Sequence, residues 1–209
     1  MITIIDYGVG NLFSLVSSLQ AIGEECIVTS KGEEILSAER IILPGVGAFG
    51  DAKAKLEETG LIPYIDKAVK NGTPLLGICL GMQMLFEKSY EYGEHEGLGF
   101  IKGVVKDMKP DLIKEGYDYK CPEMGWNALK FHNETDLFKY IKEGDYVYFV
   151  HSYYAVDCAD SLIATTDYGI TVTAGVQNGN VYGTQFHPEK SGEVGLKILK
   201  AFCEVGGKK

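Results

Sequence analysis

The chain has 209 residues, of which 45% are hydrophobic and 23% charged, and its 29 acidic and 20 basic side chains give a formal net charge of −9. This composition is that of an ordinary globular protein and argues against disorder. Nucleic acid is not an expected partner, because no cluster of Lys and Arg dense enough to follow a phosphate backbone occurs outside Lys208 and Lys209. No apolar stretch reaches the length of a membrane helix and no basic targeting region begins the chain, so we expect a cytoplasmic protein.

Apolar runs alternate with amphipathic helical patterns through the first 80 residues. Such alternation predicts βαβ units and a parallel sheet with helices on both faces. The fold expected is therefore α/β, with a mixed, mostly parallel sheet. The predicted strands are residues 2–6, 26–29, 40–43 and 74–78, and the predicted helices are residues 12–22, 51–58 and 62–71.

The pattern changes from about residue 88 to residue 130, where glycines, tyrosines and charges dominate. The strand candidate at residues 100–105 alternates apolar and polar positions, which predicts a small antiparallel insertion within a single domain spanning residues 1–209. Short turns then separate further strand candidates, with a hairpin signal at Asn178-Gly179-Asn180. The later predicted elements are strands at residues 146–150, 161–166, 171–177 and 181–185, and a helix at residues 193–203.

A cysteine framed by glycines follows the fourth predicted strand. In Gly77-Ile78-Cys79-Leu80-Gly81 the small flanking residues permit the tight strand-to-helix turn of a nucleophile elbow, with a helix predicted over residues 82–87. This turn projects the side chain from the top of a sheet, where the helix dipole favours a thiolate. Cys79 is the candidate nucleophile among five cysteines, which lack a Cys-x-x-Cys pair and are expected to be free thiols.

A cysteine nucleophile needs a base, and the chain has four histidines. His95 and His132 lie in charged or turn-forming sequence, so we expect both at the surface. His187 ends a predicted strand, and the proline after it restrains the backbone so that Glu189, two residues on, can lie beside the ring. A carboxylate there fixes the tautomer and stabilises the imidazolium, which predicts a triad of Cys79, His187 and Glu189.

A glycine-rich loop, Pro44-Gly45-Val46-Gly47, follows the third predicted strand. Two glycines around one residue let the backbone turn its N–H groups toward a ligand, as an oxyanion hole requires, and the N–H of Leu80 would add a donor. A phosphate-binding turn would have a similar composition. Because the carboxyl ends of parallel strands meet at one edge of a sheet, we expect loop, nucleophile and histidine to converge there.

Two motifs, GICLGMQ at residues 77–83 and FHPEKS at residues 186–191, resemble the triad-type (class I) glutamine amidotransferases, and the likeness spans the whole chain. Within that superfamily the chain is similar to the glutaminase subunits of imidazole glycerol phosphate synthases, from histidine biosynthesis. That closer resemblance rests on IDYGVGNL at residues 5–12, PGVGAF at residues 44–49, MGWN at residues 124–127 and FVHSY at residues 149–153.

The resemblance implies that Cys79 attacks the side-chain amide carbon of L-glutamine and forms a γ-glutamyl thioester, releasing ammonia. His187 would act as base and then acid, Glu189 would orient it, and water would complete the hydrolysis to glutamate. No metal or other cofactor is implied. The remaining inherited positions are Gly45, Val46, Gly47 and Leu80 for the oxyanion hole, and Gln83 with the backbone of Ser152 and Tyr153 for the glutamine head group.

The resemblance also implies a partner, a (β/α)8 cyclase subunit that forms a heterodimer with this chain and consumes the ammonia. Ammonia is largely protonated in neutral water and ammonium is not a nucleophile, so a dry channel between docked subunits is needed. The segment around Trp126 resembles the family's interface hinge, although a buried tryptophan in the inserted sheet is an alternative. His151 neighbours the glutamine contact and is given no catalytic role.

One position departs from the family pattern. Members usually carry histidine before Met-Gly-Trp-Asn, where this chain has Glu123, a carboxylate expected beside the interface. The ammonia acceptor therefore stays open, and an alternative is a glutaminase subunit for another acceptor, such as a sugar aminated in surface polysaccharide synthesis. A stand-alone cysteine hydrolase and a non-catalytic binding module are further alternatives.

Overall fold

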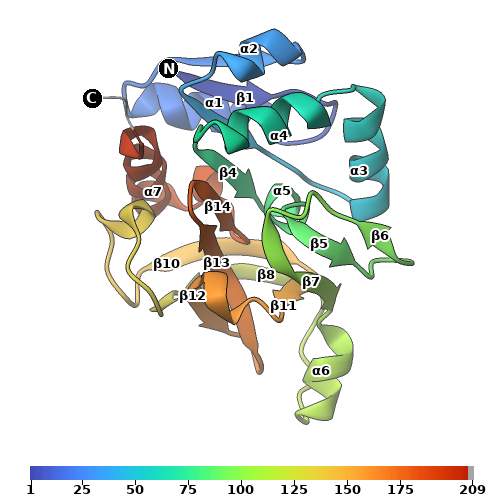
Figure 1. Ribbon diagram of the computed structural model, residues 1–209. Coiled ribbons are helices and arrows are strands. Elements are labelled where there is room, and N and C mark those ends of the chain that lie inside the picture. The colour runs from blue at the N-terminus through green and yellow to red at the C-terminus, as the bar shows by residue number, and fades with distance from the viewer. Residues whose placement is uncertain (207–209) are drawn as a thin grey trace.

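An eight-stranded sheet forms the centre of the computed structural model, which describes residues 1–206 (Figure 1). The strands on one side of this sheet pair in parallel and the last three pair antiparallel, so the sheet is mixed and mostly parallel, as predicted. The basic pair Lys208 and Lys209 lies outside the described residues. In spatial order the strands are β2 (Cys26–Thr29), β1 (Ile2–Ile5), β3 (Arg40–Leu43), β4 (Leu75–Ile78), β14 (Val181–Thr184), β13 (Thr171–Asn178), β12 (Leu162–Asp167) and β9 (Lys130–Phe131).

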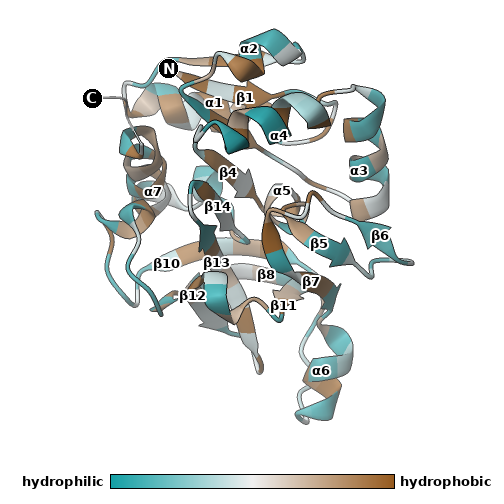
Figure 2. Cartoon of the chain, viewed as in Figure 1, coloured by the Kyte–Doolittle hydropathy of each residue, from teal (hydrophilic) through white to brown (hydrophobic). Residues whose placement is uncertain are grey.

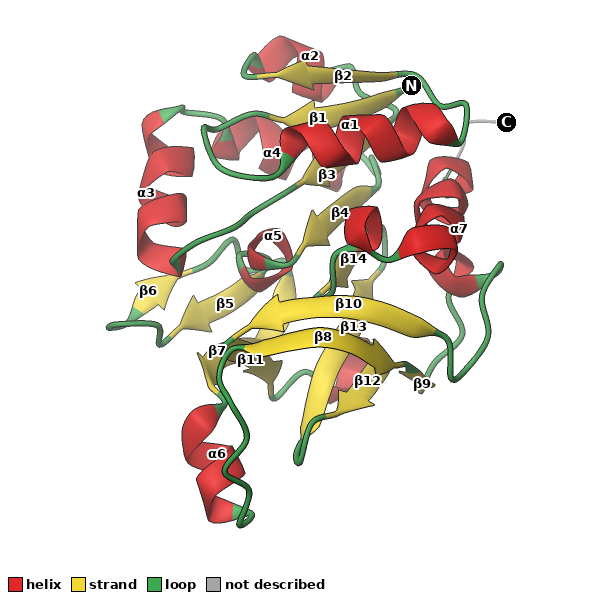
Figure 3. Cartoon of the chain, turned by 180° about the vertical axis from the view of Figure 1, so that it is seen from behind, coloured by secondary structure: helices red, strands yellow, loops and turns green. Residues whose placement is uncertain are grey.

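Helices cover both faces of the parallel strands. One face carries α1 and α7, which contact each other, and the opposite face carries α2, α3 and α4 (Figures 1 and 3). None of the helices in the described part of the chain is both long and apolar enough to span a membrane. The bounds are α1 (Leu12–Ala21), α2 (Gly32–Leu36), α3 (Phe49–Glu58), α4 (Ile62–Lys70) and α7 (Gly192–Glu204).

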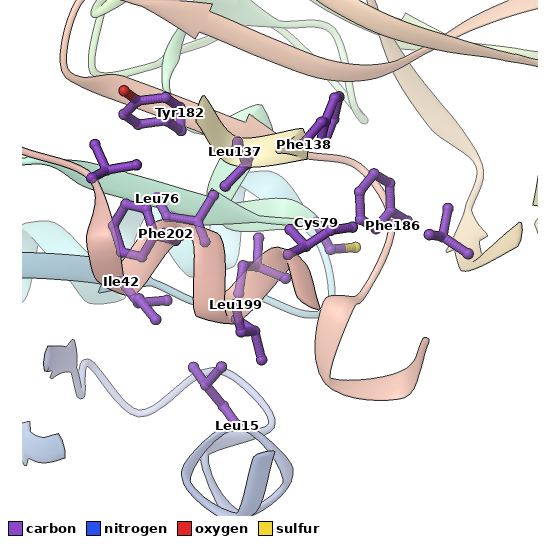
Figure 4. Packing of buried hydrophobic residues seen from close by; sticks show 14 of the residues in the cluster. Leu15, Ile42, Leu76, Cys79, Leu137, Phe138, Tyr182, Phe186, Leu199 and Phe202 are labelled. Atoms are coloured by element: carbon purple, nitrogen blue, oxygen red, sulfur yellow. The ribbon is translucent and has the colours of Figure 1, made fainter. Parts of the chain in front are cut away.

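The two faces of the sheet make two hydrophobic cores, because successive side chains of a strand point to opposite sides. Ile42 packs with Leu15 of α1 and Leu199 of α7 in one core, as Figure 4 shows. Its neighbours Ile41 and Leu43 belong to the other core, with the helices α2, α3 and α4. Hydrophobic residues accordingly predominate in β1, where Thr3 is the one polar residue and all four positions are buried (Figure 2). A strand buried on both faces reads as a continuous apolar run, which explains why these strands were predictable.

Two smaller sheets flank the antiparallel end of the central sheet. One has four strands, and in it β5 pairs with β7 in parallel while the other pairings are antiparallel. The other is a two-stranded antiparallel ribbon of β8 and β10. The strands are β11 (Tyr153–Val156), β7 (Ile101–Asp107), β5 (Phe86–Ser89) and β6 (His95–Glu96) in the first sheet, and β8 (Glu123–Ala128) and β10 (Tyr146–His151) in the ribbon.

The helix predicted over residues 82–87 is wrong. Helix α5 is a single turn, Leu80–Gln83, and the chain enters strand β5 at Phe86. The amphipathic pattern is overridden because Phe86 is fully buried and β5 finds a partner in β7. Two short helices were not predicted, α2 and the projecting α6 (Lys109–Lys114). The 3₁₀ turns are η1 (Asp136–Phe138), η2 (Ala159–Ser161) and η3 (Pro188–Lys190).

The predicted hairpin at residues 178–180 is present. Strands β13 and β14 pair antiparallel with Asn178 opposite Val181. Gly179 has a φ of +56°, a conformation that glycine adopts without steric cost. This hairpin places β14 beside β4, and the two strands end together at the edge of the sheet.

Candidate active site

Cys79 occupies the turn between β4 and α5. Its φ of +54° and ψ of −111° are rarely adopted by a residue with a side chain and mark local strain. The flanking glycines make this turn possible, since a Cβ on Gly81 would lie 1.9 Å from the carbonyl oxygen of Leu43 and one on Gly77 would lie 2.6 Å from that of Gly81. The sequence Gly77–Gly81 therefore folds into a sharp elbow at the end of a buried strand.

His187 and Glu189 meet at the end of β14. His187 Nδ1 lies 2.8 Å from Glu189 Oε1, and both side chains are buried. Because a carboxylate only accepts, Nδ1 carries the proton and donates it. Residues 188–190 form the 3₁₀ helix η3 and not the extended segment expected, yet the carboxylate still reaches the ring, and Ser191 Oγ anchors the His187 carbonyl at 2.7 Å.

The electrostatic environment of His187 favours its protonated form. Burial lowers the pKa of this histidine, but interaction with the Cys79 thiol and with the Glu189 carboxylate raises it to about 9. The second ring nitrogen, Nε2, is buried without a regular hydrogen bond. The structure thus brings the predicted nucleophile, base and carboxylate together, with one ring nitrogen left for the thiol.

The thiol of Cys79 lies among polar groups from two other strands. Its Sγ is 3.9 Å from the carbonyl oxygen of Val150, and Gln185 Nε2 approaches it to 3.8 Å. A cavity of about 530 Å³ opens beside it. Most predicted site residues border this cavity: Val46, Gly47, Cys79, Leu80, Gln83, Ser152, Tyr153 and His187. The other two, Gly45 and Glu189, lie behind them at a small void of about 10 Å³.

The loop of residues 44–47 is fixed against the elbow. A Cβ on Gly45 would come within 2.6 Å of the Gly81 backbone nitrogen, and Gly47 has a φ of +93°. The buried Tyr7 hydroxyl donates a 2.7 Å hydrogen bond to the carbonyl of Pro44. Burial and then the charge of Cys79 raise the pKa of Tyr7, so its hydroxyl stays a neutral donor. Tyr7 was not predicted as a site residue, because nothing in its sequence context shows which carbonyl it would reach.

Gln83 borders the cavity and is held by two hydrogen bonds. Its Nε2 donates to the Tyr153 carbonyl and to Gln185 Oε1, each at 3.0 Å. Ser152 and Tyr153 border the same cavity. The positions assigned to glutamine by resemblance therefore line one cavity together with the nucleophile.

A buried carboxylate, Glu91, also borders the cavity, and the sequence analysis missed it. Its Oε2 accepts a 2.7 Å hydrogen bond from the Phe49 amide at the start of α3. Burial raises the pKa of Glu91, against the lowering effects of that hydrogen bond and of His95. Glu91 stands in a segment with several other glutamates, so only its tertiary placement distinguishes it.

The three remaining histidines differ in exposure. His132 is exposed, as expected. His95 is only half-exposed, because its ring packs against Phe49 and its Nε2 lies 3.1 Å from the Glu91 carbonyl oxygen. His151 is buried and lies 3.3 Å from the Glu123 carboxylate. Within residues 1–206, no three His, Cys, Asp or Glu side chains gather as a metal site requires.

Glu123, the position that departs from the family pattern, has a buried side chain. It stands opposite His151 in the β8–β10 pairing, and both side chains lie on the inward face of the ribbon. The neighbouring positions alternate outward, and Met124 and Trp126 are 65% and 54% exposed. Trp126 is therefore a surface residue of the ribbon and not a buried residue of the inserted sheet.

The sequence matches known proteins over nearly its full length. A family model described as "Glutamine amidotransferase class-I" matches residues 3–205. The chain belongs to the class I glutamine amidotransferase family. As a class I amidotransferase it comes from a family of glutamine-hydrolysing enzymes, and the elbow, the buried histidine and the cavity described above stand at the positions of its two motifs.

The class I amidotransferase also has relatives of about half-identical sequence. A protein of Geobacillus sp. (strain WCH70), named "Imidazole glycerol phosphate synthase subunit HisH", is 50% identical over 206 residues, covering 98% of this chain and 97% of the relative. Proteins of the same name from Bacillus cereus (strain B4264) and Bacillus licheniformis are 49% and 50% identical, covering 98% and 97% of this chain and 95% of each relative.

Solved structures share the fold of this amidotransferase at low sequence identity. A "Crystal structure of glutamine amidotransferase" superposes with a TM-score of 0.73 at 19% identity, covering 97% of this chain and 100% of that one. A "Structure of PurLQS from Thermotoga maritima" gives 0.72 at 22% identity, covering 97% and 96%. These likenesses confirm the predicted mixed α/β fold.

Proposed function

We propose that the protein is the glutaminase subunit of an imidazole glycerol phosphate synthase. It hydrolyses L-glutamine to glutamate and ammonia, and it passes the ammonia to a cyclase subunit that makes imidazole glycerol phosphate and AICAR in histidine biosynthesis. Relatives with that subunit name, 50% identical over 98% of the chain, support the pathway and a cytoplasmic location. The observation that carries the chemistry is Cys79, held on a strained elbow beside a buried His187–Glu189 pair.

The geometry supports a double-displacement reaction. His187 takes the thiol proton, and the sulfur of Cys79 attacks the amide carbon of the glutamine side chain. The negative charge that forms on the amide oxygen would be stabilised by backbone N–H groups of the loop 45–47 and of Leu80. The imidazolium, stabilised by Glu189, then protonates the amide nitrogen, the C–N bond breaks and ammonia leaves. A water molecule, deprotonated by His187, hydrolyses the thioester and releases glutamate.

The cavity offers partners for the amino-acid end of glutamine. The Glu91 carboxylate lines it and is suited to the α-ammonium group, because a buried carboxylate gains most from a cation. Gln83, Ser152 and Tyr153 line the same cavity. A glutamine anchored there would present its side-chain amide to Cys79.

The exposed side of the β8–β10 ribbon is the surface that would bind the (β/α)8 cyclase in a heterodimer. Trp126 packs edge-on against Tyr148, with ring centroids 6.1 Å apart, and Lys190 lies over the same Tyr148 ring at 6.0 Å. Lys190 also borders the cavity, so this exposed aromatic surface adjoins the route from the active site. The carboxylate of Glu123, which suggested another ammonia acceptor, is buried and does not contribute to this surface.

The test is glutamine hydrolysis by the complex with the cyclase encoded in the same organism. We expect glutamate to form rapidly when the cyclase and its phosphoribulosyl-formimino ligand are present, slowly when the chain is alone, and not at all in Cys79→Ala. Cys79→Ser is the matched control, because it keeps the size of the side chain and lacks the thiolate. Full activity of the isolated chain would contradict coupling to a cyclase, and peptide cleavage without glutamine hydrolysis would favour a stand-alone hydrolase.

A further inference from the structure

A buried acid–base pair connects the ribbon to the glutamine-binding wall. Glu123 and His151 stand opposite each other at one end of the β8–β10 pairing. Glu123 Oε2 lies 3.3 Å from His151 Nε2, and the two side chains are 3% and 2% exposed. Neither group belongs to the proposed triad. Burying two ionisable groups costs desolvation free energy unless each has a partner, so a buried pair of this kind suggests a function.

The hydrogen bonds around the pair define where its protons lie. His151 Nδ1 is 2.9 Å from the Tyr153 carbonyl oxygen, which can only accept, so Nδ1 carries a proton. Glu123 Oε1 accepts from Asn127 Nδ2 at 3.2 Å, while Glu123 Oε2 and His151 Nε2 have no regular hydrogen bond elsewhere. These two atoms face each other at 3.3 Å, so each is the nearest polar partner of the other. The contact with Glu123 keeps the His151 ring in the orientation in which Nδ1 donates to the Tyr153 carbonyl oxygen.

The same carbonyl leads to the nucleophile. Tyr153 O also accepts from Gln83 Nε2 at 3.0 Å, and Gln83 is bonded in turn to Gln185 Oε1. Gln185 Nε2 reaches 3.8 Å from the Cys79 sulfur. A continuous chain of polar contacts therefore runs from Glu123 through this carbonyl to Cys79. Such connected groups hold one another in place more firmly than isolated pairs do.

We propose that Glu123 is a positioning residue for glutamine, acting through His151 on the Tyr153 carbonyl and Gln83. This inference rests on the proposed glutaminase function. Without the carboxylate, Nε2 of His151 loses its partner and the ring is free to turn from the carbonyl. The backbone that borders the glutamine end of the cavity then loses one of the two donors that fix it, and substrate binding weakens more than the chemistry at Cys79.

The first experiment compares Glu123→Met with Glu123→Gln in the complex with the cyclase. Met keeps the volume and removes the polar partner, whereas Gln can donate an amide hydrogen to neutral His151 Nε2. We expect the KM for glutamine to rise about tenfold in Glu123→Met, which is the effect of losing one hydrogen bond, and kcat to change less than about twofold. Glu123→Gln should have a KM and a kcat close to those of the wild type. Leu112→Ala, a core change in a separate hydrophobic cluster, is the stability control.

The second experiment labels Cys79 in the same variants with a glutamine-analogue diazoketone and with iodoacetamide. Glu123→Met should slow labelling by the analogue about tenfold and leave iodoacetamide labelling unchanged, since only the analogue needs the head-group site. Two outcomes would overturn the inference. One is that Glu123→Met leaves unchanged both the KM for glutamine and the ratio of the two labelling rates. The other is that Glu123→Gln or Leu112→Ala raises the KM as much as Glu123→Met does. Absence of glutamine hydrolysis in the wild-type complex would instead overturn the proposed function.

Discussion

The raised pKa of His187 predicts how the stability of the fold depends on pH. A pKa of about 9 in the folded protein, against 6.5 for an ordinary histidine, corresponds to about 3 kcal/mol of folding free energy. Because the folded pKa is the higher one, this contribution is fully present below pH 6.5 and is lost as the pH rises through 9. His187→Asn removes it, so wild type and variant should differ most in stability at low pH.

The assay is urea unfolding of wild type and His187→Asn between pH 6 and pH 9.5. We expect the difference in unfolding free energy to shrink by about 3 kcal/mol across this range. The comparison is repeated in a Cys79→Ala background, where the shrinkage should be smaller, since Cys79 raises this pKa along with Glu189. A difference that stays constant with pH would refute the electrostatic account of the pair.

Three further changes test the active-site geometry. Gly81→Ala places a Cβ 1.9 Å from the Leu43 carbonyl oxygen, and the displacement of the elbow should lower kcat/KM at least about 100-fold in the hydrolysis assay. Tyr7→Phe removes the hydrogen bond to Pro44, which should lower the free energy of unfolding in urea by about 1 kcal/mol. We also expect kcat to fall while KM is unchanged. A raised KM with a normal kcat would argue against a role of Tyr7 in holding the loop of residues 44–47. Glu91→Gln still accepts from the α3 amide but lacks the charge, so KM for glutamine should rise about tenfold or more, and an unchanged KM would remove Glu91 from the substrate site.

Features that depend on local chain geometry were predictable from the sequence. Strands β2 and β3 were located to the residue, because both read as short apolar runs between turn signals, although only β3 is buried along its length and β2 is the edge strand. The elbow at Cys79 was equally visible, since a sharp turn between close backbones admits only glycine at its flanks. The adjacency of His187 and Glu189 was predictable too, although η3 and not an extended segment produces it.

Features that depend on long-range packing were decided only by the tertiary structure. The helix predicted over residues 82–87 is absent, and strand β5 begins at Phe86. There the burial of Phe86 and the pairing of β5 with β7 outweigh the helical pattern of the local sequence. Glu91 and Glu123 look like surface glutamates in sequence, and each is buried by elements elsewhere in the chain.

The sequence by itself determined the central strands, the elbow and the chemical type of the nucleophile, because steric limits on a tight turn and the pattern of a buried strand act within a few residues. The tertiary structure alone decided which carboxylates line the cavity and that Glu123 pairs with His151. The reason is physical: desolvation and ion pairing depend on which groups meet across the fold, 28 positions apart for these two residues, and no local pattern records such a meeting.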